Sequence, residues 1–168
     1  MKREIEGSVT LNSFFARFYL DLQERIRENV PEIEWIEQDF GQDVFDKWRP
    51  NVAFPAVLID FPNTRYEAEA GLSQWAEADI NIRLLVAPFS QSYDDAPIEV
   101  KEEALQYFEI EQKLINSLHG WCPEDDNGNS YCQPLIRKSI FSDNRNDLGL
   151  RIRSIAFGTA YEEDFEAA

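Results

Sequence analysis

The chain has 168 residues, with 32 acidic and 16 basic side chains, so its formal net charge is −16 with the single histidine neutral. This charge opposes the phosphate backbone and excludes a nucleic-acid-binding surface as the default. The length predicts one domain over residues 1–168 with frayed charged ends at 1–8 and 162–168. No apolar run approaches the roughly 20 residues of a membrane helix, and the charged N-terminus predicts no signal peptide. We therefore expect the protein in the cytoplasm of the producing cell.

The first predicted element is an amphipathic helix over residues 11–29. Apolar side chains recur at steps of three and four from Leu11 to Ile26, which places them along one helix face. Thr10 is the predicted N-cap. The helix ends at Val30, because the residue before a proline is pushed out of the helical conformation.

Strands are expected over the middle of the chain. A short strand at 33–36 is followed by a turn at 39–42, and the mostly apolar run at 54–61 is typical of a buried strand. Residues 78–86 alternate strictly between apolar and polar, which predicts a strand with one buried face. The polar segment at 63–77 is expected to form a loop or the arm of a ragged hairpin.

The second half of the chain predicts a helix and a hairpin. The helical period returns over 98–118, with one predicted face made of Leu105, Phe108, Ile115 and Leu118. A polar loop follows, and strands at 134–141 and 148–157 form a hairpin. Apolar positions in the last strand change parity near Ser154, which predicts a β-bulge or a sharp bend. The order of elements predicts an α+β fold: a mainly antiparallel sheet of about four strands with two long helices packed on one face.

The residues favour no catalytic chemistry. Nucleotide-binding, zinc-protease and hydrolase motifs are absent from the sequence. His119, Cys122 and Cys132 have the residue types of a zinc site, but a zinc site requires four ligands, and only His119 and Cys122 have the usual spacing. The alternative is that His119 closes the helix while the cysteines behave as small apolar residues. We expect no enzyme activity, no cofactor and no metal.

Positive charge is concentrated in residues 135–153, on an otherwise acidic chain. These side chains are either solvated strand and turn residues or a patch that directs head-to-tail association with an acidic patch on another copy. The aromatic residues between 35 and 54 are either core packing or a second contact patch. The candidate interface residues are Arg137, Lys138, Arg145, Arg151, Arg153, Trp35 and Trp48.

The succession of segments resembles the tail-terminator and head-to-tail joining proteins of tailed bacteriophages and prophages, including the short Mu-like tail proteins. The resemblance covers about residues 10–161 and is carried by the helix at 11–29, the strands at 54–61 and 78–86, the helix end from Leu114 to Trp121 and the strand ending at Tyr161.

The resemblance implies a small α+β domain that forms a ring, commonly a hexamer, at the end of the tail tube. Implied partners are further copies of the chain, the tail-tube protein and the head-tail connector, with no membrane and no sequence-specific nucleic acid. The implied location is the virion tail, after assembly in the cytoplasm of a bacterial host. The acidic segment at 65–77 and the loop from Cys122 to Cys132 depart from the family, which leaves terminator and neighbouring joining protein as alternatives.

Two other classes of function stay open on the sequence. An acidic binding module, such as a DNA mimic that inhibits a nucleic-acid enzyme, fits the charge of −16 equally well. An enzyme that uses the region of His119 is the third hypothesis. A ring that forms with rising concentration favours assembly, whereas a strict monomer that blocks a nuclease favours mimicry.

Overall fold

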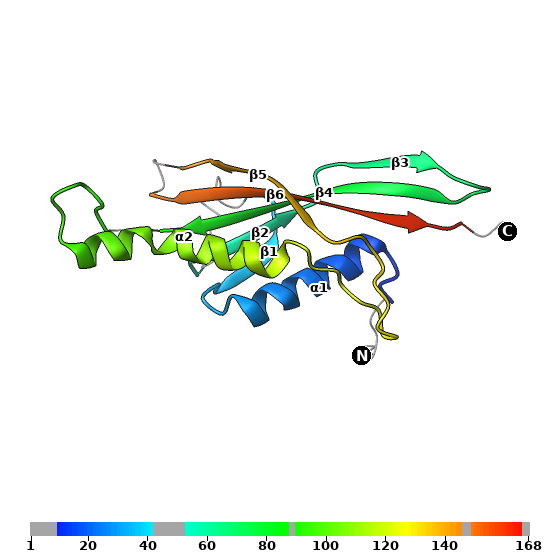
Figure 1. Cartoon of the computed structure of the whole chain (residues 1–168), viewed down its shortest axis with the longest axis horizontal. Helices are drawn as coiled ribbons and strands as arrows, with labels where there is room; N and C mark the ends of the chain where they lie inside the picture. Colours follow the sequence, from blue (N-terminus) through cyan, green and yellow to red (C-terminus); the bar gives the residue numbers. More distant parts are fainter. Residues whose placement is uncertain (1–9, 42–52, 88–89, 146–148, 166–168) are drawn as a thin grey trace.

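The computed structural model describes residues 10–41, 53–87, 90–145 and 149–165. Within them the chain forms two helices and six strands (Figure 1). Their bounds are α1 Phe14–Asn29, β1 Trp35–Gln38, β2 Ala56–Asp60, β3 Thr64–Ala68, β4 Gln74–Val86, α2 Ile98–Leu118, β5 Ile136–Ser142 and β6 Arg151–Glu163. In this described part of the chain, neither helix is both long and apolar enough to span a membrane.

The strands form one mixed sheet in the order β1-β2-β4-β6-β5. Strands β1 and β2 are parallel, the other neighbours are antiparallel, and β3 pairs with the first residues of β4. The predicted α+β class with two helices is confirmed, but the mainly antiparallel sheet of about four strands is wrong. Two strands exceed the predicted number. They are β3, whose side chains are mostly exposed, and β1, whose parallel partner lies some twenty residues further along the chain.

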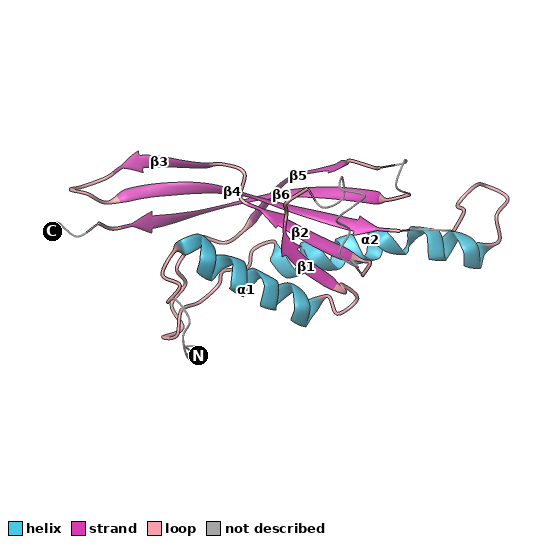
Figure 2. Cartoon of the chain, turned by 180° about the vertical axis from the view of Figure 1, so that it is seen from behind, coloured by secondary structure: helices cyan, strands magenta, loops and turns pink. Residues whose placement is uncertain are grey.

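Both helices pack on one face of the sheet, and Figure 2 shows the same layering from behind. The main core lies between them and the sheet, and its fully buried members include Phe18, Leu22, Ile26, Leu114, Leu118, Ile80, Ile82, Leu84 and Phe157. The predicted first helix is confirmed and ends at Asn29 as expected, but it begins at Phe14 instead of Leu11, and its N-cap is Ser13 and not Thr10. The Ser13 carbonyl accepts a hydrogen bond from the Arg17 N–H at 3.1 Å, which starts the helical hydrogen bonding.

Helix α2 has the bounds that its periodicity predicts, but part of its predicted buried face is wrong. Leu105 is 44% exposed and Phe108 is 39% exposed, whereas Ala104 and Glu111 are buried. The packed side of α2 runs through Ala104, Glu111 and Leu118, so Leu105 and Phe108 lie at its margin. Glu111 lies on this side because it pairs with Arg153 of β6, and apolar spacing alone does not identify such a position.

Strand β6 has no bulge at Ser154, so that prediction is wrong. Its register with β4 is unbroken from Gln74↔Glu163 to Val86↔Arg151. The change of parity arises because the strand buries side chains on both faces. Ile155 belongs to the main core, whereas Ile152 belongs to a second cluster, which comprises Ala56, Leu58, Leu85, Leu150 and Ile152.

A three-stranded arm projects past the helices (Figures 1 and 2). It consists of β3, the first residues of β4 and the last residues of β6, which pair with one another. Of the two alternatives predicted for 63–77, the hairpin arm is therefore confirmed and the loop is wrong. Strand β4 begins four residues before the predicted strand. Strand β6 continues to Glu163, so its regular structure enters the end segment that was predicted to fray.

Candidate interaction surfaces

Strand β5 forms one edge of the sheet, because β6 is its only strand partner among the described residues. Ile136 is 52% exposed and Phe141 is 53% exposed, and the Arg137 side chain is also exposed. An edge strand has backbone N–H and C=O groups that no neighbouring strand pairs, and on β5 the Arg137 N–H donates to His119 Nδ1 at 3.1 Å instead. This edge combines exposed apolar and cationic side chains, and we call it the β5 edge (Ile136, Arg137 and Phe141).

Lys138 is engaged within the sheet. The β5–β6 register shifts between Arg137 and Ser139, which makes Lys138 the extra residue of a β-bulge. Its Nζ donates a hydrogen bond to Asp79 Oδ1 at 2.8 Å, and this contact holds the pKa of Asp79 below its usual range. The lysine passes over Gly158, where an added Cβ would lie 2.4 Å from Lys138 Cε. The glycine therefore leaves room for the ion pair between β5 and β4.

Arg153 is also engaged, and it joins β6 to α2. Its Nη2 donates to Glu111 Oε1 at 3.1 Å, and its Nε donates to Glu111 Oε2. Nη1 donates to Ser142 Oγ at 2.8 Å, and the guanidinium lies over the Phe108 ring at 5.3 Å. The fork geometry and the buried carboxylate are typical of a structural ion pair.

The remaining candidate residues have different environments. Arg151 is exposed, while Arg145 is partly buried and forms a backbone bridge with Leu150. Trp35 packs against the second cluster, and its Nε1 donates to Glu37 Oε2 at 3.1 Å, which agrees with the core-packing alternative. Trp48 lies outside the described residues. Among the described members of the predicted basic patch, Arg137 and Arg151 are therefore the exposed cations that form no ion pair with a described carboxylate, whereas the exposed Lys138 is paired with Asp79.

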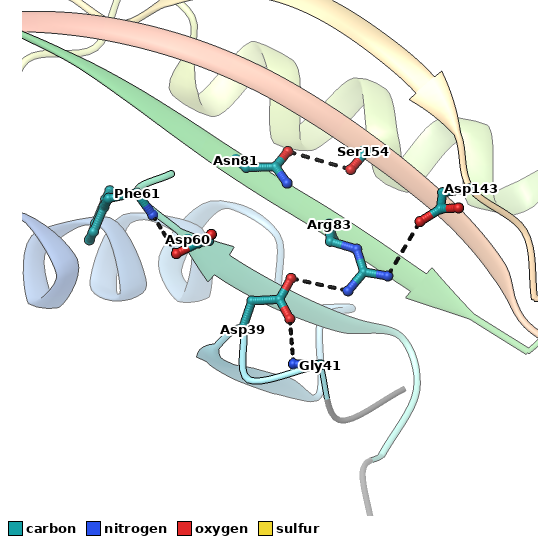
Figure 3. A network of polar contacts seen from close by, with 8 residues as sticks. All are labelled: Asp39, Gly41, Asp60, Phe61, Asn81, Arg83, Asp143 and Ser154. Carbon is teal, nitrogen blue, oxygen red and sulfur yellow. Dashed lines mark hydrogen bonds and ion pairs between the residues drawn. The ribbon is translucent and has the colours of Figure 1, made fainter. Parts of the chain in front are cut away.

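A polar network on the side of the sheet away from the helices was missed by the sequence analysis (Figure 3). Arg83 Nη1 lies 3.0 Å from Asp39 Oδ2, and Nη2 lies 3.7 Å from Asp143 Oδ2. The Asp39 carboxylate also accepts the Gly41 N–H at 2.9 Å. Arg83 thus connects β4 to the segments that follow β1 and β5. The carboxylates come from distant segments, so no local pattern identifies this network.

A groove of about 430 Å³ lies between α1 and the ends of β1 and β2. Most of its lining is apolar, although Gln38, Asp39 and Asp60 also border it; the apolar lining residues are Leu11, Phe15, Ala16, Tyr19, Leu20, Ile59 and Phe61. The Asp39 carboxylate itself is directed to Arg83 on the other face of the sheet. Leu11 and Leu20 are 52% and 48% exposed. The sign of this groove in the sequence was the apolar stripe on α1, because the stripe is wider than the part of the helix that the core buries. We call this feature the α1 groove.

The residues considered for zinc have other partners. His119 is the C-cap residue of α2, as predicted, and its Nδ1 accepts the Arg137 N–H at 3.1 Å. Cys122 and Cys132 are free thiols, and burial raises the pKa of Cys132 to about 11. Across the described residues, no three His, Cys, Asp or Glu side chains are grouped as metal ligands.

The projecting arm is strongly acidic. Its carboxylates belong to Glu67, Glu69, Glu77, Glu162, Glu163 and Asp164. Asp164 and Glu69 raise the pKa of Glu162, which is the effect of like charges held close together. Arg65 provides a cation on this arm, and its Nη2 lies 3.0 Å from Glu77 Oε2. The acidic arm and the β5 edge therefore carry opposite charge.

The architecture defines an α+β protein with a mixed six-stranded sheet and both helices on one face. A solved chain described as belonging to the virion of a native gene transfer agent (GTA) particle has the same fold, with a TM-score of 0.52. The match covers 90% of this chain and 100% of that chain at 11% sequence identity. No family model and no curated protein matches the sequence. The likeness to a virion protein is thus one of fold.

Proposed function

We propose that the protein is a structural component of a phage-like virion and acts through contacts, not catalysis. The observation that carries this proposal is the fold shared with a chain of a gene transfer agent virion, because the match spans the full length of that chain. The order of segments that resembles tail-terminator and joining proteins points to the same class of function. A shared fold does not by itself establish a shared function. A virion protein also requires exposed surfaces that can contact other virion proteins.

We propose further that copies of the chain form a ring that terminates the tail tube or joins the tail to the head. Strands β1 and β5 lie at opposite edges of the sheet, and the surfaces near them differ in charge and shape. Two different patches on one molecule support a heterologous contact, which generates a closed ring when the rotation between copies closes. The tail-tube and head-tail connector proteins are then the partners at the two faces of the ring.

Electron microscopy and light scattering of the purified chain test this proposal. The expected result is a ring of fixed diameter whose population rises with protein concentration. A strict monomer that inhibits a nuclease contradicts the proposal and favours a DNA mimic, since mimicry requires only an aligned row of carboxylates. Electron microscopy with a tagged chain then locates the ring on assembled particles.

A further inference from the structure

We propose that the acidic arm of one copy binds Arg137 of the next copy through the indole ring of Trp75 and the carboxylates of Glu67 and Glu162. We call these last three residues the Trp75 site. This inference rests on the proposed function and names one contact between neighbouring copies in the ring. It starts from the register of the three strands of the arm.

The register places the Trp75 site on the face of the arm away from the helices. Trp75 of β4 pairs directly with Glu67 of β3 on one side and with Glu162 of β6 on the other. Directly paired residues lie on the same face of a sheet, with Cβ atoms roughly 4.5–5.5 Å apart. Tyr161, the neighbour of Glu162 in β6, packs in the main core beneath the helices, so the Trp75 site faces the opposite way. An indole ring therefore lies between two carboxylates on the helix-free face.

Trp75 contributes to neither core cluster of the described residues. Its side chain is partly exposed, and in the part of the chain that the structure describes no cation lies over its ring. Elsewhere the chain does place arginines over aromatic rings, at Tyr131, Trp121 and Phe108. Among the aromatic side chains, tryptophan attracts a cation over its face most strongly. The ring of Trp75 is therefore suited to receive a cation from another molecule.

The carboxylates around the indole favour a cation as the ligand. Asp164 and Glu69 lie close enough to Glu162 to raise its pKa, because like charges oppose its ionisation. Arg65, on the same arm, is held by Glu77, with Nη2 3.0 Å from Oε2. The arm thus has an excess of negative charge that its own arginine does not offset.

Arg137 has the properties that this site requires. Its side chain is exposed and forms no ion pair with a described carboxylate, and its backbone N–H donates to His119 Nδ1 at 3.1 Å. His119 caps α2, and the last turns of that helix, residues 112–118, carry no carboxylate that would repel an acidic partner. A planar guanidinium stacks on an aromatic face and still donates hydrogen bonds from its edge. It can therefore lie over Trp75 and reach the carboxylates beside it.

The arm is placed to reach another copy, because it projects past the helices of its own chain (Figures 1 and 2). Its strands are tied together by the Arg65–Glu77 pair and by the hydrogen bond between the Tyr66 and Tyr161 hydroxyls at 3.2 Å. A site that is ordered before binding loses less conformational freedom on association. The Trp75 site and Arg137 are different patches, so their contact continues around a ring instead of stopping at a dimer.

Reciprocal charge reversal tests the assignment on the full chain, with association measured by sedimentation up to about 1 mM. Glu67→Arg and Arg137→Glu are each expected to weaken association about tenfold, and the double variant is expected to return it to within about threefold of wild type. Glu67→Arg lowers the net negative charge, so its effect cannot arise from global repulsion. The matched controls are Glu102→Arg and Arg151→Glu, which make the same charge changes at exposed positions elsewhere and are expected to change association less than about threefold.

The aromatic part of the site has its own test. Trp75→Leu is expected to weaken association about tenfold, and Trp75→Tyr about threefold, because tyrosine keeps a ring that attracts cations less strongly. Trp75 lies outside the core clusters, so both variants are expected to keep the circular dichroism spectrum of the wild type. Equal association of the leucine variant and the wild type overturns the role of the indole.

Zero-length cross-linking identifies the contact directly. In Arg137→Lys, a carbodiimide joins the new amine to a carboxylate that touches it, with loss of water, and a mixture of 15N-labelled and unlabelled chains separates links between copies from links within one copy. We expect links between copies from position 137 to Glu67 or Glu162. Links from position 137 to other carboxylates only, absence of rescue, or a wild-type chain that is monomeric at about 1 mM overturns the assignment. If the chain is nonetheless found at the tail end of particles, the proposed function stands and only this contact is wrong.

Discussion

Replacing Arg153 separates a structural cation from an interface cation on the same strand. The Glu111 carboxylate is buried and receives two hydrogen bonds from Arg153, which ties α2 to β6. Arg153→Leu removes the cation and leaves a buried carboxylate on α2. Arg151→Leu is the matched control, because Arg151 is exposed two residues earlier on β6.

The expected loss of stability follows from how deeply the ion pair between Arg153 and Glu111 is buried. Removing one partner of a fully buried ion pair costs about 3–5 kcal/mol. The Arg153 side chain is 21% exposed, so water recovers part of that cost, and we expect a loss of about 2–3 kcal/mol in the free energy of unfolding. With a urea dependence of about 2 kcal/mol/M, the unfolding midpoint falls by about 1–1.5 M. Arg151→Leu is expected to change stability by less than about 0.5 kcal/mol.

Urea unfolding followed by circular dichroism measures these changes. The double variant Arg153→Leu with Glu111→Leu is expected to be more stable than Arg153→Leu alone, because apolar residues replace both charges and no carboxylate stays buried without a cation. If Arg153→Leu costs no more than Arg151→Leu, or if the two substitutions are additive, the ion pair does not hold α2 and the assignment of Arg153 to the fold is refuted.

Two further predictions concern the β-bulge and the cysteines. Lys138→Met is expected to raise the pKa of Asp79 in an NMR titration, and Gly158→Ala is expected to do the same by displacing the lysine. Because the folded pKa of Asp79 is lowered, the ion pair stabilises the fold above the unfolded pKa of about 3.9, and this stabilisation is lost as the pH falls through the folded pKa. The lysine is half-exposed, so the stabilisation is limited to a few tenths of a kcal/mol. Iodoacetamide at pH 7.5 is expected to label Cys122 before Cys132, because Cys132 is buried with a raised pKa; mass spectrometry that finds Cys132 labelled first contradicts this.

The local apolar periodicity was sufficient to predict the helices and strands that form the core. Helix α2 has the predicted bounds of 98–118, and β4 contains the predicted strand at 78–86, because both have a regular apolar period over several turns or pairs. The parallel pairing of β1 with β2 was not predictable in this way, since it depends on contacts between segments far apart in the chain. The parity change in β6 was detected, but its cause is burial on two faces.

For the candidate surfaces, too, local sequence patterns do not reveal contacts between distant segments. The basic segment was visible as a local excess of charge, but the carboxylates that engage Lys138 and Arg153 come from β4 and α2. Counting charges along one segment cannot reveal these partners. The α1 groove likewise requires α1 and the end of β2 to be placed side by side, although the exposed Leu11 belongs to the apolar stripe seen in the sequence. Leu20 lies outside that stripe, so its place in the groove was not predicted.

Immunogold electron microscopy of particles that carry an epitope-tagged copy of this chain tests the central claim most directly. The account predicts gold at a single position on each particle, at the end of the tail that meets the head. Particles that form normally without any label, while the tagged chain stays free in the cell extract, would contradict a structural role in the virion.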